Sequence, residues 1–352
     1  MQGEFKSHYS IKEHLQLKLY LMRFLLISGI GFTRNFVANI VKRIIGMEIY
    51  FNPSEILFRD YIAYSLGVGS KPRITLRSLS GEGAGIQGVG NQAHLRMNAI
   101  NVARVLNIPY VHMPFSEIGH ADRPMELWDR AWEAEFNLGV GEIPAKMPDH
   151  GALDLTHNYW SFAHCFGGYE NLHRIFNITY KHFREKYYSD KVPRLNPLLI
   201  VGVHVRRGDV SRDVTEQWTE LCNIATTVAK IRNVLDKRRS KYRILVFSNG
   251  IHSEFDDLKS LEVELFLNVD PIWTMRELIE ADILVMAKST FSYTAAIISD
   301  GIKLYEPCYL PPLKGWLVRQ PKGDFDERLF TVQLEAMFRS NGLFRSREHQ
   351  SS

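Results

Sequence analysis

Two arginines, a histidine and an aspartate follow an apolar run in the stretch LLIVGVHVRRGDV, residues 198–210. A short run of branched apolar residues is typical of a buried strand in a parallel sheet. Open α/β sheets bind their ligands outside the carboxyl ends of such strands. Because adjacent residues of an extended chain point to opposite sides, we expect one of Arg206 and Arg207 to face a ligand and the other a structural partner. Guanidinium groups bind phosphate through paired hydrogen bonds, so the cluster is a candidate anion site.

His204 and Asp209 complete this cluster. His204 shares the side of Arg206, and Asp209 is placed to fix a guanidinium group or to hold the loop. The alternative interpretation is an ion pair that stabilises the end of a strand. The clustering of all four polar residues at a carboxyl end favours a functional site.

A second candidate site lies in DILVMAKSTFSYTAAIISDG, residues 282–301. The pattern predicts a strand, a hydroxyl-rich turn and a helix that Ser289 or Thr290 caps, with Phe291 and Ser292 in its first turn. Free N–H groups and hydroxyls at a helix N-terminus can hold a phosphate. Plain capping, the alternative, needs only one hydroxyl.

Two more segments could contribute to binding. In FSNG, residues 247–250, Ser248 and Asn249 close a predicted strand and can contact a base or ribose, although a turn explains the pair equally well. In GIQGVGNQAHLRMNAINVARVLN, residues 85–107, a glycine-rich turn opens a predicted helix. Glycines let the backbone approach a ligand closely, and a helix N-terminus suits an anion.

Length and composition limit the possible classes of protein. The 352 residues are 45% hydrophobic and 23% charged, which is ordinary globular composition. This length predicts roughly two domains of about 150 residues each, plus an extension. Three widely spaced cysteines indicate neither a disulfide framework nor a zinc site. A net charge of +4, without a long basic stripe or interleaved aromatics, argues against a nucleic-acid binder.

Regular alternation of strand and helix patterns predicts an α/β fold with parallel sheets. We expect an N-terminal helical extension over residues 1–70, a first domain over 71–195 and a second over 196–345, with the linker at 193–197. The strands predicted for the second domain are 198–205, 243–248, 262–268, 282–287 and 303–306, and its helices are 215–237, 252–260, 273–281 and 290–300.

The N-terminal segment is basic. Residues 1–46 hold seven Lys or Arg and two Glu, in stretches with helical apolar spacing. A basic amphipathic helix can lie on an anionic membrane surface, but a helical layer packed on the domain is the more ordinary interpretation. No secretory signal and no stretch long enough to span a bilayer is evident, so we expect a cytoplasmic protein, with possible contact to the membrane's cytoplasmic face.

The motifs resemble those of one enzyme superfamily. HVRRGD at 204–209 is similar to the HxRRxD motif of the α1,2-, α1,6- and protein O-fucosyltransferases. GVGNQAHLRMNAINVARVLN at 88–107 and KSTFSYTAAII at 288–298 resemble two further segments of the α1,2-fucosyltransferase branch. The resemblance implies a GT-B fold with two Rossmann-like domains facing across a cleft, a GDP-fucose donor and inversion at the anomeric carbon.

The resemblance also assigns residue roles. Arg206 would bind the β-phosphate of GDP, with His204 and Asp209 supporting it or contacting the donor. No metal is required, because Arg206 neutralises the leaving diphosphate, and no cofactor is expected. The remaining donor-binding residues would be Gly88, Gly90, Asn91, Gln92, Ser248, Asn249, Ser289, Thr290, Phe291 and Ser292.

An inverting transfer needs a base near the acceptor hydroxyl, or else a highly dissociative mechanism. Asp213 follows the arginine motif and is the preferred candidate, with Glu216 as its neighbour. His112, His120 and Asp122 follow a strand of the first domain and are the alternatives.

The sequence thus predicts a glycosyltransferase that transfers fucose to a glycan or lipid-linked oligosaccharide in cell-surface polysaccharide synthesis. Two alternatives stay open. One is an enzyme of the same fold that uses another nucleotide sugar, and the other is a non-catalytic nucleotide- or glycan-binding relative.

Overall fold

The computed structural model describes residues 71, 73–76, 87–145, 153–154, 169–194 and 197–340. The predicted extension over residues 1–70, including the basic segment 1–46, lies outside these residues. The chain divides into two compact units, Met1–Pro72 with Asn158–Leu172 and Arg73–His157 with His173–Ser352. The predicted boundaries at residues 70 and 195 stay predictions.

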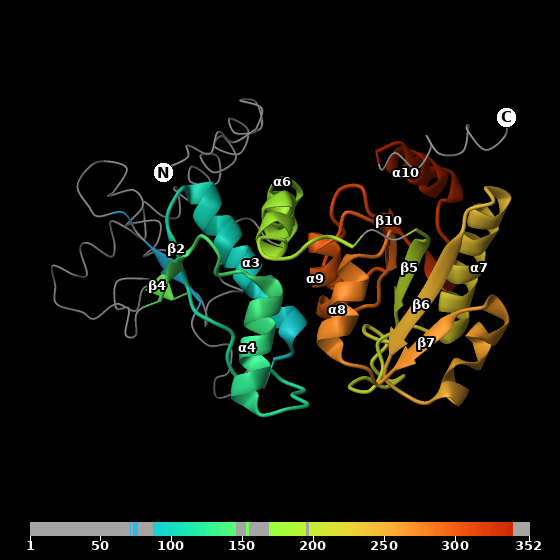
Figure 1. Ribbon diagram of the computed structural model, residues 1–352, viewed down its shortest axis with the longest axis horizontal. Coiled ribbons are helices and arrows are strands. Elements are labelled where there is room, and N and C mark those ends of the chain that lie inside the picture. Colours follow the sequence, from blue (N-terminus) through green and yellow to red (C-terminus); the bar gives the residue numbers. More distant parts are fainter. Residues whose placement is uncertain are drawn as a thin grey trace, which may run out of the picture. The chain divides into compact units, whose positions relative to one another are not determined.

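The first sheet has four short strands, all parallel, in the order β3-β2-β1-β4. Its central strands are buried, and the long helix α3 packs on β1 and β2 (Figure 1). Its elements are β1 (Ile74–Thr75), α3 (Val89–Leu106), β2 (Tyr110–His112), α4 (Met125–Phe136), β3 (Ile143–Pro144), β4 (Leu153–Asp154) and α6 (Tyr169–Tyr187).

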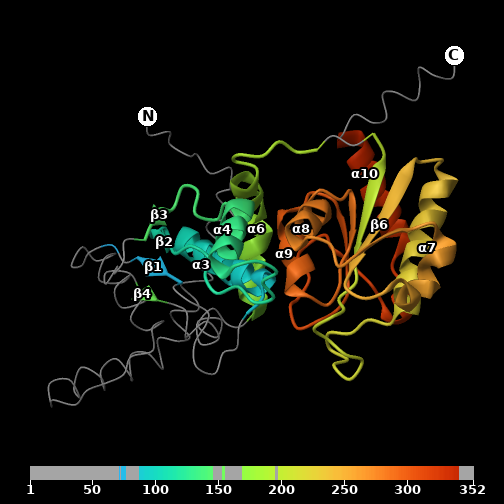
Figure 2. The same ribbon diagram turned by 60° about the horizontal axis from the view of Figure 1, so that its bottom comes forward.

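The second sheet has six parallel strands in the order β10-β9-β8-β5-β6-β7. Figures 1 and 2 show α7 on one side of this sheet and α8 and α9 on the other. Its elements are β5 (Leu199–His204), α7 (Leu221–Lys237), β6 (Tyr242–Ser248), η2 (His252–Leu261), β7 (Glu264–Leu267), α8 (Pro271–Ile279), β8 (Ile283–Val285), α9 (Thr290–Ile298), β9 (Ile302–Tyr305), β10 (Leu317–Val318), η3 (Pro321–Gly323) and α10 (Glu327–Ser340).

This strand order is that of a dinucleotide-binding Rossmann sheet, in which the first strand, β5, lies beside the fourth, β8. Alternate residues of β5, among them Val201 and Val203, join a continuous apolar core with α7 and α10. On the opposite face, Gly202 lies against α8, where an added Cβ would be 3.0 Å from the Cβ of Ala281. The expected α/β class with parallel sheets is confirmed.

The glycine-rich turn at the start of α3 brings this helix of the first sheet into contact with α9 of the second sheet. Gly90, in the first turn of α3, lies against the first turn of α9, and Thr294 donates a hydrogen bond of 3.0 Å to the Gly90 carbonyl. A Cβ on Gly90 would be 2.5 Å from the Phe291 nitrogen, which no side-chain rotation can relieve. Glycine is therefore required here for close packing of two helices.

Replacing Gly90 by alanine should destabilise the protein by about 1–3 kcal/mol, because overpacking against backbone outweighs the better helix propensity of alanine. Gly88→Ala is the matched control, since its Cβ would meet only His120 at an ordinary 3.6 Å. Urea unfolding of the two variants checks this. Equal unfolding midpoints would show that α3 and α9 do not make the contact.

Candidate active site

The arginine motif and the hydroxyl-rich turn meet at the topological switch point of the second sheet. β5 and β8 are hydrogen-bonded neighbours, although α7, two strands and α8 separate them in the chain. The connection after β5 leads to α7 on one face, and the connection after β8 leads to α9 on the other (Figure 1). Such a divergence opens the crevice in which doubly wound sheets bind ligands.

Arg206 spans the two strand ends. Its Nε and Nη2 donate to the two carboxylate oxygens of Asp209 at 3.2 and 2.7 Å, and its Nη1 donates to the Lys288 carbonyl at 3.4 Å. Burial acts to raise the pKa of Asp209, but the hydrogen bonds from Arg206 outweigh it and lower that pKa. The guanidinium side chain remains 22% exposed, so it is held in one orientation and still reaches solvent. This arrangement suits paired hydrogen bonds to a phosphate.

Arg207 has a structural role. Its guanidinium stacks on the Trp218 ring at 3.6 Å and donates to the carbonyls of Arg206 at 2.8 Å and Thr219 at 2.9 Å. Burial lowers its pKa. The side chain therefore ties the loop after β5 to the start of α7, as expected for the arginine that faces a structural partner.

His204 is desolvated beneath the turn that precedes α9. Its ring lies 5.4 Å from the Phe291 ring, and Nδ1 has no hydrogen-bond partner among the described residues. Burial, with Arg206 contributing, lowers its pKa to about 4. His204 is consequently neutral at pH 7, so the positive charge of the site comes from Arg206 and its neighbours.

The hydroxyls of the β8–α9 turn are mostly used within the turn. Ser289 caps α9 by accepting the Phe291 N–H at 3.2 Å. Ser292 is fully buried, and its hydroxyl bonds to the backbone of Ala287. Thr290 is half-buried at the first position of the helix. The structure thus presents the start of α9, rather than three available hydroxyls, at the strand edge.

The N-termini of two helices converge here through the Gly90 contact. α3 has no side-chain cap at Gly88, and neither α3 nor α9 has an acidic residue in its first turn. Each N-terminus carries about half a positive charge from the peptide dipoles. Together with Arg206 they produce a positive edge that favours an anion.

The other residues of the glycine motif turn away from that edge. Gln92 is 1% exposed, donates to the Ser116 carbonyl at 3.1 Å and accepts from Arg96 at 3.1 Å. The Asn91 amide bonds to the side chain of Gln87. Gln92 thus holds the loop that follows β2 and Asn91 the segment before α3, whereas Gly88 and Gly90 lie at the helix start.

Ser248 and Asn249 lie after β6, next to the arginine loop. The Ser248 hydroxyl is buried and donates to the carbonyls of Val205 at 2.8 Å and Asn249 at 3.0 Å. Asn249 is exposed and lies against Gly208, where an added Cβ would be 2.9 Å from its Nδ2. Of this pair, the side chain open to a ligand is that of Asn249.

The candidate bases differ in their surroundings. Asp213 is exposed in the loop between β5 and α7. His112 is 5% exposed and bonds to Glu133 at 2.7 Å, and Asp122 forms an ion pair with Arg123 at 2.6 Å. His120 is exposed with a positive φ of 63°, and its ring lies beside Gly88. Among the described residues, Asp213, its neighbour Glu216 and His120 are thus the candidates that are exposed and form no ion pair.

Two charged residues of the edge are absent from the sequence-based set. Lys288 supplies the carbonyl that Arg206 binds, and its Nζ donates to the Thr215 carbonyl at 3.1 Å. Glu306 directly follows β9 and lies 3.7 Å from Lys288 Nζ. Their position, one to three residues beyond a parallel strand, is the signal that could have found them.

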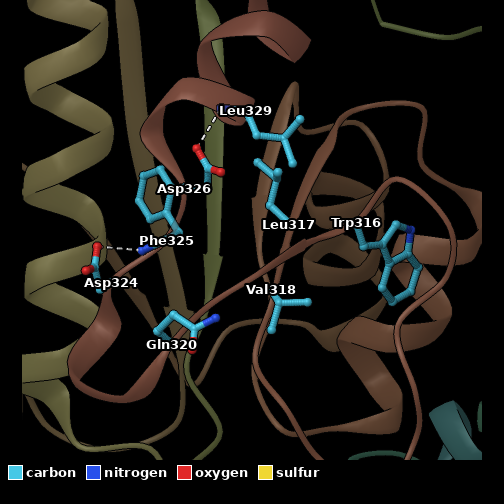
Figure 3. A pocket seen from close by; sticks show the side chains of 8 residues that line it. All are labelled: Trp316, Leu317, Val318, Gln320, Asp324, Phe325, Asp326 and Leu329. Carbon is cyan, nitrogen blue, oxygen red and sulfur yellow. Dashed lines mark hydrogen bonds between the residues drawn. The ribbon is translucent and has the colours of Figure 1, made fainter.

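A pocket of about 460 Å³ lies elsewhere, beside β10 and the start of α10 (Figure 3). None of the predicted site residues lines it. Its two carboxylates have backbone partners, since Asp324 accepts the Phe325 N–H at 2.7 Å and Asp326 accepts the Leu329 N–H at 2.9 Å (Figure 3). The remaining lining residues are Trp316, Leu317, Val318 and Gln320.

No helix among the described residues is both long and apolar enough to cross a membrane. In the same part of the chain, no three His, Cys, Asp or Glu side chains are grouped so that they could hold a metal ion.

The model of glycosyl transferase family 11 matches residues 177–309, which include the arginine motif and the β8–α9 turn. The resemblance to fucosyltransferases and the expectation of a glycosyltransferase are confirmed by this match. Among curated proteins, none matches the chain significantly.

Solved structures give weaker similarities. POFUT1 in complex with GDP-fucose has 14% identity and a TM-score of 0.34, covering 66% of this chain and 94% of that chain. POFUT1 in complex with GDP has 14% identity and a TM-score of 0.31, covering 66% and 95%. The E. coli heptosyltransferase WaaC with ADP-2-deoxy-2-fluoro heptose has 11% identity and a TM-score of 0.36, covering 75% and 98%.

Lowering the pH should reduce the stability of the folded protein, because His204 is desolvated there. Its pKa is about 4 when folded against an ordinary 6.5, so only the unfolded chain gains this proton as pH falls below 6.5. Stability should fall by up to about 3 kcal/mol between pH 6.5 and pH 4 from this residue. The free energy of unfolding, measured with urea at several pH values in that range, should change less steeply with pH for His204→Asn than for the wild type. An equal pH dependence in the two proteins would show that His204 is solvated.

Proposed function

We propose that the chain is an inverting glycosyltransferase that transfers fucose from GDP-fucose to a glycan hydroxyl. The observation that carries the proposal is Arg206, held by Asp209 and the Lys288 carbonyl at the switch point, inside the family 11 segment. The diphosphate of a nucleotide sugar would lie against this guanidinium and the start of α9. The family's link to fucose transfer supports this donor.

In the proposed reaction, the bond between the anomeric carbon and the diphosphate breaks, and negative charge develops on the β-phosphate. Arg206 and the two helix N-termini would stabilise that charge, without a metal ion. Because Asp209 already orients the guanidinium, little reorganisation is needed in the transition state. Asn249, which is exposed beside the arginine loop, would contact the base or ribose.

The acceptor hydroxyl loses its proton as it attacks the opposite face of the sugar. Asp213 is the proposed base, and His120 is the alternative because its ring lies beside Gly88 at the start of α3. The proposed acceptor is a glycan or lipid-linked oligosaccharide of a cell-surface polysaccharide. Residues 1–46 would bring the enzyme to that acceptor at the cytoplasmic face of a membrane.

Calorimetric titration with GDP, UDP and ADP in EDTA tests the donor class. The wild type should bind GDP selectively, and Arg206→Ala should weaken GDP binding by about 10–150-fold, because a charged phosphate contact is lost. Arg243→Ala is the matched control. This arginine lies near the start of β6, at the opposite edge of the sheet, and pairs with Glu264 at 2.6 Å.

Each outcome decides between the alternatives. Preference for UDP or ADP with the same Arg206 dependence would replace fucose by another nucleotide sugar. GDP binding without hydrolysis or transfer of GDP-fucose would favour a non-catalytic relative. Absence of nucleotide binding would leave Arg206 a structural residue and overturn the proposal.

Flotation with anionic liposomes tests the membrane role. The full chain should float with the vesicles, and a chain lacking residues 1–70 should remain at the bottom, because seven basic residues are lost with the segment 1–46. High salt should release the full chain. Equal flotation of both chains would remove the membrane from the proposal.

A further inference from the structure

Glu306 links segments that are far apart in the sequence at the edge where Arg206 lies. It directly follows β9, between the strand ends of β8 and β10. Its side chain is 13% exposed. A carboxylate so shielded from water requires partners, and Glu306 has three.

One carboxylate oxygen, Oε2, accepts hydrogen bonds from the Thr219 hydroxyl at 2.6 Å and from Nη2 of Arg319 at 2.5 Å. The other, Oε1, lies 3.7 Å from Nζ of Lys288. Thr219 precedes α7, Lys288 follows β8 and Arg319 follows β10. Glu306 therefore joins the segment before α7 to the segments that follow β8 and β10.

Two of these partners also hold the arginines of the motif. The Lys288 carbonyl accepts Nη1 of Arg206, and the Thr219 carbonyl accepts Nη2 of Arg207. Lys288 Nζ in turn donates to Thr215, in the loop that leads to Thr219. A shift of either segment moves the atoms that orient the two guanidinium groups.

The charge balance makes Glu306 hard to replace. Arg319 is 1% exposed, and its Nε and Nη1 have no partners among the described residues, so Glu306 is its hydrogen-bonded counter-ion there. Removing the carboxylate charge would leave a buried guanidinium uncompensated beside Lys288. Lys288 and Arg319 would then repel each other across the site.

We propose that Glu306 is a positioning residue for the diphosphate of the donor. It holds Lys288 and Thr219 in place, so that Arg206 stays aimed at the β-phosphate. The inference rests on the proposed function, because the β-phosphate is the group that Arg206 is proposed to bind. It adds a residue outside the three motifs to the donor site.

The test compares GDP with GMP, which lacks the β-phosphate, by calorimetric titration of the full chain. The ratio of the two affinities reports the β-phosphate contact, whereas a loss of folded protein lowers the stoichiometry of both titrations and leaves the ratio unchanged. The wild-type ratio should fall strongly in Arg206→Ala. In Glu306→Gln, which keeps the shape but removes the charge, the ratio should fall by about threefold or more.

A double variant separates positioning from general stability. If Glu306 acts through Arg206, Glu306→Gln should change the ratio no further in the Arg206→Ala background. Thr219→Val, which removes one hydrogen bond to Glu306, should lower the ratio in the same direction but less, and it provides a milder variant if Glu306→Gln folds poorly. Glu277→Gln is the matched control, a buried carboxylate on α8 that pairs with Arg194 at 2.8 Å.

The outcomes are distinguishable. A wild-type preference for GDP that depends on Arg206 but survives both Glu306→Gln and Thr219→Val would overturn the inference and leave the proposed function intact. Equal effects of Glu306→Gln and Glu277→Gln on the ratio would also overturn it. A wild type that binds GDP no better than GMP would overturn the proposed function, and the inference with it.

Discussion

An arginine that serves an external anion must be oriented by the protein without being fully neutralised by it, and Arg206 meets this condition. Asp209 takes two of its N–H groups and the Lys288 carbonyl takes a third, while part of the side chain stays exposed. Among the described residues, the hydrogen-bonded network that contains Arg206 and Glu306 has four cationic side chains, Arg206 included, and two carboxylates, and no acidic side chain lies in the first turn of α3 or α9. The members are Arg206, Arg207, Lys288 and Arg319 against Asp209 and Glu306.

This excess positive charge depends on backbone geometry. The carboxyl ends of β5 and β8 are adjacent because the chain crosses from one side of β5 to the other at this point. The start of α3 reaches the same place only because Gly90 permits contact with Phe291. The sheet therefore positions the charges, and a single missing Cβ admits the second helix N-terminus.

Sequence patterns predicted most of the second sheet, because each buried parallel strand is a local apolar run. β5, β6, β7, β8 and β9 all lie within two residues of the predicted strands. α7 is different, since it begins at Leu221 and not at residue 215. Residues 215–219 are instead drawn into tertiary contacts, in which Trp218 stacks with Arg207 and the Thr215 carbonyl accepts from Lys288. The helix propensity of residues 215–219 does not reveal these tertiary partners.

The same limit explains which site residues could be predicted. The placement of Arg206 and Arg207 on opposite sides follows from the two-residue period of extended chain. The inward use of Ser292 and Gln92 could not be foreseen, because each bonds to backbone whose position depends on packing. β10, η3 and α10 were not predicted, and with them Arg319 was missed as a partner of Glu306.

Glu306 shows how a site can depend on a residue that no local motif contains. Its hydrogen bond to Thr219 joins residues 87 apart in the chain, and its contacts lie behind Arg206 instead of facing solvent. Substituting Arg206 removes a contact with an anion, whereas substituting Glu306 disturbs the two segments that orient the motif. In a low-dielectric edge such an ionic partner acts through geometry as much as through charge, since buried cations move when their counter-ion is lost. The motif supplies the guanidinium, and distant strands determine where it points.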